Sequence, residues 1–149
     1  MTLDLQLREL DSIIHRHFAS TGYDVRERQS LPGIGTYITI ETSGIWVRAT
    51  AEHDAYVVEV ATPRQPEEWH HLPEVLLLLT GEAYAPEKVR VGKNPDDLDR
   101  FCRLLSEQLS AVVDLFSVDR LPNTVERLTT IRQQAVRPLF ELAKNRPAS

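Results

Sequence analysis

The stretch that decides the fold is "GTYITIETSGIWVRATAEHDAYVVEVA", Gly35–Ala61. Its segments 36–41, 45–50 and 55–61 are rich in Val, Ile, Tyr and Thr and alternate largely between apolar and polar side chains, as half-buried strands do. The separating "TSG" and "AEHD" have the composition of tight turns. A comparable run, "YDVRERQ" at 23–29, precedes them. Because short connections join antiparallel neighbours, we predict a four-stranded antiparallel meander.

Alternation assigns the strand residues to two faces of this sheet, since successive side chains of a strand point to opposite sides. The mostly apolar set is expected to face helices and comprises Val25, Ile38, Ile40, Ile45, Val47, Tyr56, Val58 and Val60. The opposite set comprises Arg26, Arg28, Tyr37, Thr39, Glu41, Trp46, Arg48, Val57 and Glu59. One apolar and one polar face are typical of an antiparallel sheet that is covered on one side.

Helices are predicted before and after the strands. Apolar residues from Leu3 to Phe18 recur at helical spacing. Asn94 and Pro95 are suited to begin a helix that carries an apolar stripe as far as Phe116. A last helix is expected at 121–144, with Pro138 kinking or breaking it. The fold class is therefore α+β: an N-terminal helix, a four-stranded antiparallel meander, and C-terminal helices packed on one sheet face, in a single domain over residues 1–149.

The segment "PEEWHHLPE", residues 66–74, concentrates chemically versatile side chains after the last strand. Pro66 fits the first position of a helix, where carboxylates of the first turn are stabilised by the helix dipole. We therefore predict two short helical pieces divided by Pro73. Adjacent histidines diverge on a helix, and the HExxH pattern that places two histidines on one face is missing, so no metal site is predicted.

No catalytic residue or cofactor site is predicted. His15 and His17 diverge on the first helix, and Cys102 falls on an apolar stripe, where thiols are usually inert. The glycines at 33–35 lack the spacing and the following helix of a dinucleotide-binding loop. We expect a protein that is not an enzyme. A small enzyme that uses histidines and acids for general acid–base catalysis is kept as an alternative.

Charge is distributed unevenly within the net −5. Residues 120–149 carry six basic and two acidic side chains, a net +4, and residues 1–119 carry eleven basic and twenty acidic ones, a net −9. The acidic part argues against nucleic acid as a partner and suits a basic protein, although an acidic surface also serves solubility alone.

Sequence features also bear on location. The longest apolar run is five residues, 75–79, far short of the roughly 20 that span a bilayer, so no membrane partner is expected. The N-terminus lacks the basic start and apolar core of a signal peptide. One cysteine excludes an internal disulfide, which fits a cytoplasmic protein.

Two groups of residues are candidates for binding a partner. The first joins the turn before the last strand to the segment after it and comprises Glu52, His53, Asp54, Glu67, Glu68, Trp69 and His70. The second lies on the polar sheet face and comprises Tyr37, Trp46 and Arg48, because aromatic residues and arginine are enriched at interface hot spots. The alternative is that a helix of the chain, or a second subunit, covers this face.

The order of helix, strands and helices resembles two groups of bacterial helper proteins. The resemblance is carried by "LDLQLRELDSIIHRHF", the strand region 35–61 and "NPDDLDRFCRLLSEQLSAVVDLF". The first group is the cytoplasmic immunity proteins of polymorphic-toxin systems, which implies an acidic protein that covers a cognate toxin. The second is the type III secretion chaperone-like proteins, which implies a homodimer. The additional helix at 121–144 departs from the chaperone-like pattern.

Overall fold

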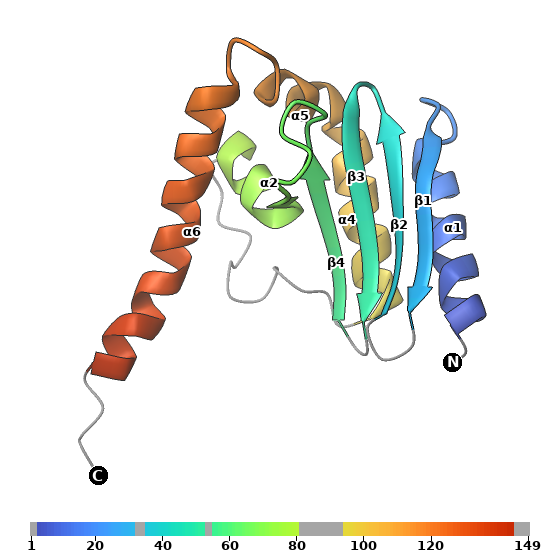
Figure 1. Cartoon of the computed structure of the whole chain (residues 1–149), viewed down its shortest axis with the longest axis horizontal. Helices are drawn as coiled ribbons and strands as arrows, with labels where there is room; N and C mark the ends of the chain where they lie inside the picture. The colour runs from blue at the N-terminus through green and yellow to red at the C-terminus, as the bar shows by residue number, and fades with distance from the viewer. Residues whose placement is uncertain (1–2, 32–34, 53–54, 81–93, 145–149) are drawn as a thin grey trace.

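The chain forms an antiparallel sheet with helices on one side and further helices beyond one edge, as the computed structural model shows (Figure 1). The structure describes residues 3–31, 35–52, 55–80 and 94–144, and side chains within 5–133 of these ranges. The elements are α1 (Leu3–Phe18), β1 (Asp24–Leu31), β2 (Gly35–Thr42), β3 (Ile45–Glu52), β4 (Ala55–Ala61), β5 (His70–His71), α2 (Leu72–Thr80), α4 (Pro95–Glu107), α5 (Leu109–Leu115) and α6 (Leu121–Lys144). The predicted α+β architecture is confirmed.

The sheet has the strand order β1-β2-β3-β4-β5, and every neighbouring pair is antiparallel. The first four strands are the predicted meander. Ser43 and Gly44 connect β2 to β3, and both have positive φ (51° and 84°), the conformation that matches a two-residue turn to the twist of a hairpin. This turn sets the register in which Glu41 lies opposite Trp46. The fifth strand, which pairs His70 with Val60, was not predicted.

The hydrophobic core lies between the sheet and the helices. Figure 1 shows α1 and α4 on the same side of the strands. Ile40, Val47 and Val60 of the sheet are buried together with Phe18 of α1 and Phe101 of α4. The predicted helix-facing residues are buried, except that Val25 is partly buried against the same core. Alternation therefore identified the core face of β2, β3 and β4.

The face predicted for Arg28 is wrong because of a β-bulge in β1. The register between β1 and β2 skips a residue between Val25 and Glu27. A bulge adds one residue to one strand and so reverses the alternation beyond it. Arg28 consequently lies opposite Ile38, on the helix side, and its Nη2 donates to Asp11 Oδ1 of α1 over 3.0 Å.

The segment after β4 is not the predicted helix. Backbone bonds from Gln65 N to Thr62 O and from Glu68 N to Gln65 O close two successive turns, and the chain then pairs with β4. Pro73 does not divide a helix. It is the second residue of α2, where a missing N–H costs nothing because the first N–H groups of a helix have no partner within it.

The C-terminal helices begin where they were predicted to begin, but they are interrupted at different positions from those predicted. The Asn94 side chain accepts from Asp97 N over 3.0 Å, as expected of an N-cap. The single helix predicted to reach Phe116 is interrupted at Gln108, which separates α4 from α5. The helix α6 continues through Pro138 to Lys144, so of the predicted kink or break at this proline, the break is absent. None of the described helices is both long and apolar enough to cross a membrane.

Candidate functional site

The segment between β4 and α2 places two adjacent side chains in different surroundings. The Trp69 ring packs beside Trp46 on the face of the sheet opposite the helices, with 6.5 Å between ring centroids and 32° between ring planes. His70, the first residue of β5, is instead buried, and its ring lies 5.5 Å from that of Phe116. Because neighbouring residues of a strand point to opposite sides, this short strand directs Trp69 outward and His70 inward.

Two arginines stack on these tryptophans. The guanidinium carbon of Arg26 lies 4.9 Å from the ring centroid of Trp46, and that of Arg48 lies 4.2 Å from the ring centroid of Trp69. Such contacts attract a cation to the electron-rich face of the ring. We call Arg26, Trp46, Arg48 and Trp69 the aromatic–arginine cluster. It joins residues from β1, β3 and the segment before β5 into one surface.

Carboxylates hold both arginines in place. Arg26 Nη1 donates to Glu41 Oε2 over 2.5 Å, and Arg48 Nη2 donates to Glu59 Oε1 over 3.0 Å. The second pair is the more buried, with side chains 29% and 15% exposed. A planar guanidinium that is stacked and ion-paired has already lost much of its conformational freedom. The cluster is therefore an ordered unit within the chain, and a preordered surface lowers the entropic cost of any contact made on it.

Tyr37 shares this face but lies outside the cluster. It pairs with Thr50, whereas Trp46 pairs with Glu41, so four residues along the strands, roughly 13 Å, separate the two positions. The Tyr37 hydroxyl donates to Glu27 Oε1 over 3.0 Å. Burial, followed by this hydrogen bond to a carboxylate, raises the pKa of Tyr37 above its ordinary value. The predicted patch of Tyr37 with Trp46 is therefore two separate positions.

A pocket of about 400 Å³ adjoins the cluster at Trp69. Four predicted site residues, Glu67, Glu68, Trp69 and His70, line it together. The helix α6 supplies the remaining lining residues, which are Val125, Leu128, Thr129 and Arg132. We call this space the α6-side pocket. Trp69 belongs to both features and links the outer sheet face to the pocket.

Charged and polar groups of different kinds meet around this pocket. Arg132 Nη2 lies 3.6 Å from Oε2 of Glu74, a carboxylate that is almost completely buried at the start of α2. Burial, followed by the positive charge of Arg132, lowers the pKa of His70. Lowering the pKa favours the neutral imidazole, which has one nitrogen that donates and one that accepts. His70 therefore brings hydrogen-bonding capacity without a charge.

Several buried polar atoms without a hydrogen-bond partner lie in β3, in the segment before β5 and in β5 itself. Within the described residues they include Trp46 Nε1, Gln65 Oε1, His70 Nδ1 and His71 Nδ1. Buried polar atoms in native proteins are nearly always satisfied by protein or by ordered water. Trp46 and His71 belong to the outer face of the sheet and His70 to the side that faces the helices, so these atoms do not share one surface, but His70 also lines the α6-side pocket.

The structure divides the first predicted binding group. Glu52 is exposed at the end of β3, next to the turn into β4, whereas Glu67 to His70 lie near Val60 at the opposite end of β4. The length of β4 separates the two sets of residues, so they do not form one surface. His53 and Asp54 lie outside the described residues.

The contribution of α6 was missed at the sequence level. Val125, Leu128, Thr129 and Arg132 recur at intervals of one, three and four, which places them on one side of a helix. This spacing could have grouped them. Nothing local in the sequence indicates that this side of α6 would meet the residues before β5.

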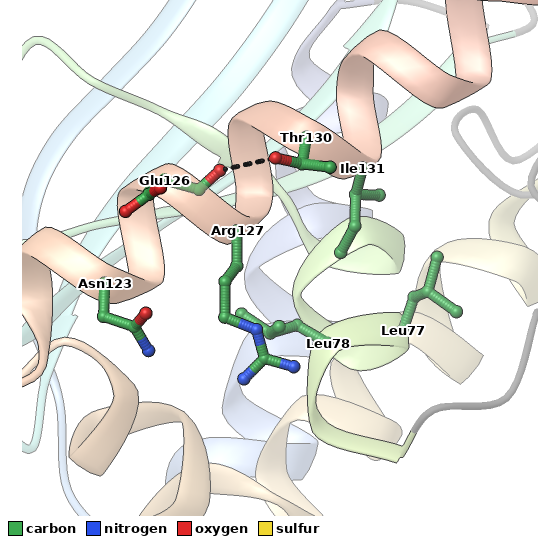
Figure 2. Close-up of a pocket in the computed structure, with 7 residues that line it drawn as sticks. All are labelled: Leu77, Leu78, Asn123, Glu126, Arg127, Thr130 and Ile131. Carbon is green, nitrogen blue, oxygen red and sulfur yellow. Dashed lines mark hydrogen bonds between the residues drawn. The ribbon is translucent and has the colours of Figure 1, made fainter.

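A second pocket, of about 320 Å³, lies on a different side of α6 (Figure 2). It is lined by Leu77 and Leu78 of α2 and by Asn123, Glu126, Arg127, Thr130 and Ile131 of α6. Figure 2 shows Arg127 extending alongside Leu78, with Ile131 and Leu77 further along the gap. Three aliphatic side chains line it, in contrast to the carboxylate-rich α6-side pocket.

His70 and Cys102 lie in surroundings that form neither an acid–base pair nor a reactive thiol, and the part of the chain that the structure describes contains no metal-binding cluster. Among the described residues, no hydrogen bond joins His70 to a carboxylate, and no group of three or more His, Cys, Asp or Glu side chains is arranged to hold a metal ion. His17 instead contacts Asp99 of α4 over 2.9 Å at the helix interface. Burial raises the pKa of the Cys102 thiol to about 12, which keeps it protonated at neutral pH.

Three comparisons with known proteins found nothing similar to this chain. No protein-family model matches the chain, and searches of curated proteins and of solved structures likewise found no match.

Proposed function

We propose that this chain is a protein-binding module that acts as a cytoplasmic immunity protein, neutralising a cognate toxin by covering it. The observation that carries this proposal is the aromatic–arginine cluster, in which Trp69 contacts both Trp46 and Arg48 on the outer face of the sheet. Tryptophan and arginine are the side chains most enriched at interface hot spots. A partly exposed surface of these residues, fixed in advance by ion pairs, suits recognition of another protein.

The charge distribution supports a basic partner. Residues 1–119 carry a net −9, and Glu67 and Glu68 are exposed directly beside the cluster. Complementary charge speeds the encounter of two proteins and fixes their relative orientation. Within the cluster itself the arginines are already paired with Glu41 and Glu59, so its contribution is packing area and not net charge.

The first test uses the product of the neighbouring gene, because immunity genes sit beside their toxin genes. We expect the chain to form a stoichiometric complex with that product and to restore growth of cells that express it. Trp69→Ala and Trp46→Ala should each weaken the complex by about 30-fold or more, the loss that corresponds to a hot spot of roughly 2 kcal/mol. Isothermal titration calorimetry measures this change.

The matched control is Leu5→Ala. Leu5 is 50% exposed on α1, on the side of the sheet away from the cluster, and its truncation should leave binding unchanged. Circular dichroism of every variant checks that the fold persists. Equal binding by all three variants would show that the cluster is not the interface. A chain that forms only a homodimer and ignores the neighbouring product would instead favour the chaperone-like alternative.

A further inference from the structure

The α6-side pocket is more acidic than basic. Glu67 and Glu68 line it, and Glu74 lies at 3.6 Å from Arg132, whose positive charge it partly offsets. Two carboxylates and one guanidinium therefore line the pocket, and Glu74, which does not line it, offsets part of the positive charge of that guanidinium. An anionic ligand would meet more repulsion than attraction here, whereas a cation would be stabilised by the surplus carboxylates.

A second observation, independent of the carboxylates, points to a ligand that donates hydrogen bonds. His70 lines the pocket, is only 7% exposed, and its Nδ1 has no hydrogen-bond partner among the described residues. A neutral imidazole has one nitrogen that accepts from an N–H group, while Thr129 brings a hydroxyl from α6. Trp69 also lines the pocket, with the guanidinium of Arg48 stacked on its ring.

We propose that the α6-side pocket binds the cationic end of a basic side chain of the partner, with arginine preferred. This inference deepens the proposed function and rests on it. A guanidinium has five N–H donors in a planar fork, which match two carboxylates and an imidazole nitrogen better than the compact ammonium of lysine does. A volume of about 400 Å³ suits a single long side chain.

The test needs no identified partner. The probe is N-acetyl-arginine N-methylamide, and its matched control is the corresponding citrulline derivative, which has nearly the same shape but no charge. Both are titrated into the full chain while NMR follows the indole N–H of Trp69 and the ring signals of His70. We expect saturable shifts with the arginine derivative and at least tenfold weaker binding of the citrulline derivative.

Two double variants decide whether the pocket carboxylates are responsible. Glu67→Gln with Glu68→Gln should weaken binding of the arginine derivative by tenfold or more. Glu52→Gln with Glu107→Gln removes the same charge from exposed positions outside the pocket and should leave binding unchanged. Equal loss in both double variants, equal binding of the two probes, or no shift at Trp69 and His70 would overturn the inference.

A free metabolite could also supply the cationic group, and comparing ligands distinguishes this source from a protein side chain. Tighter binding of free arginine or spermidine than of the blocked derivative would indicate a small-molecule site and overturn the assignment to a partner's side chain. The experiments also distinguish failure of the inference from failure of the proposed function. A partner whose binding depends on Trp46 but not on Glu67 and Glu68 would refute only the inference. Binding of the arginine derivative without any Trp-dependent protein partner would refute the proposed function and leave the preference of the pocket for a guanidinium standing.

Discussion

The two faces of the sheet are built from alternate residues of the same strands, yet they differ in what stabilises them. On the helix-covered face, Ile40, Val47 and Val60 are buried among apolar side chains of α1 and α4. On the outer face, Trp46 and Arg48 lie between these same positions and are held by stacking and ion pairs. We therefore expect stability to depend mainly on one face and the proposed partner recognition on the other, so that each changes separately on mutation.

The largest effect is expected from the covered face. Phe101→Ala should lower the free energy of unfolding by about 3–5 kcal/mol, because truncation of a fully buried aromatic side chain leaves a cavity. Urea denaturation measures this loss, with the exposed Leu5→Ala as a control that should change stability by less than about 0.5 kcal/mol. A loss below about 1 kcal/mol in Phe101→Ala would mean that this face does not dominate stability.

An intermediate effect should distinguish two arginines on opposite faces. Arg48→Ala should cost about 1–2 kcal/mol, because it removes a stacked side chain and leaves the largely buried Glu59 without its ion-pair partner. Arg28→Ala breaks an exposed pair with Asp11 and should cost less than about 1 kcal/mol. Urea denaturation of the two variants in parallel tests this order. The reverse order would contradict the view that the outer-face cluster is an ordered unit.

The smallest effect concerns pH and the inward-facing His70. Burial lowers its pKa in the folded state, whereas the unfolded chain takes up the proton near the ordinary value of about 6.5. The unfolded state therefore binds more protons in the interval between these values, and stability falls as pH drops from about 6.5 towards the folded-state pKa. His70→Gln should remove this part of the acid sensitivity.

Urea midpoints at about pH 7.5 and pH 5.5 measure the difference between wild type and His70→Gln, with the exposed His15→Gln as the control. Asp99 does not interfere, because the hydrogen bond with His17 lowers its pKa and confines its titration to more acidic conditions. Equal losses on acidification in wild type and His70→Gln would show that the imidazole is not held neutral by its surroundings.

Sequence patterns predicted the parts of the fold that depend on local alternation. The runs around Ile38, Val47 and Val58 repeat every two residues, and this period identifies both the strands and their buried face. The bulge that moves Arg28 to the helix side adds a single residue without a distinctive composition, so alternation alone could not detect it.

The candidate site was predicted only in part, for a related reason. The sequence drew attention to Trp46, Trp69 and the residues between Glu67 and His70. It treated them as two unrelated groups, because the prolines and glutamates of this segment have the composition of a helix start. The pairing of His70 with Val60 and the packing of α6 are tertiary contacts, and only these bring the two tryptophans and the pocket together.

The stack of Trp46 and Trp69 has a practical consequence. The chain contains two tryptophans, and they are the two whose rings lie 6.5 Å apart in the cluster. The entire intrinsic tryptophan fluorescence of the protein therefore originates at the surface proposed to bind the partner. Two indoles this close also couple their electronic transitions, which produces a paired signal in circular dichroism that vanishes when either ring moves. Tryptophan fluorescence and circular dichroism can thus report on occupancy of this surface in the unlabelled protein.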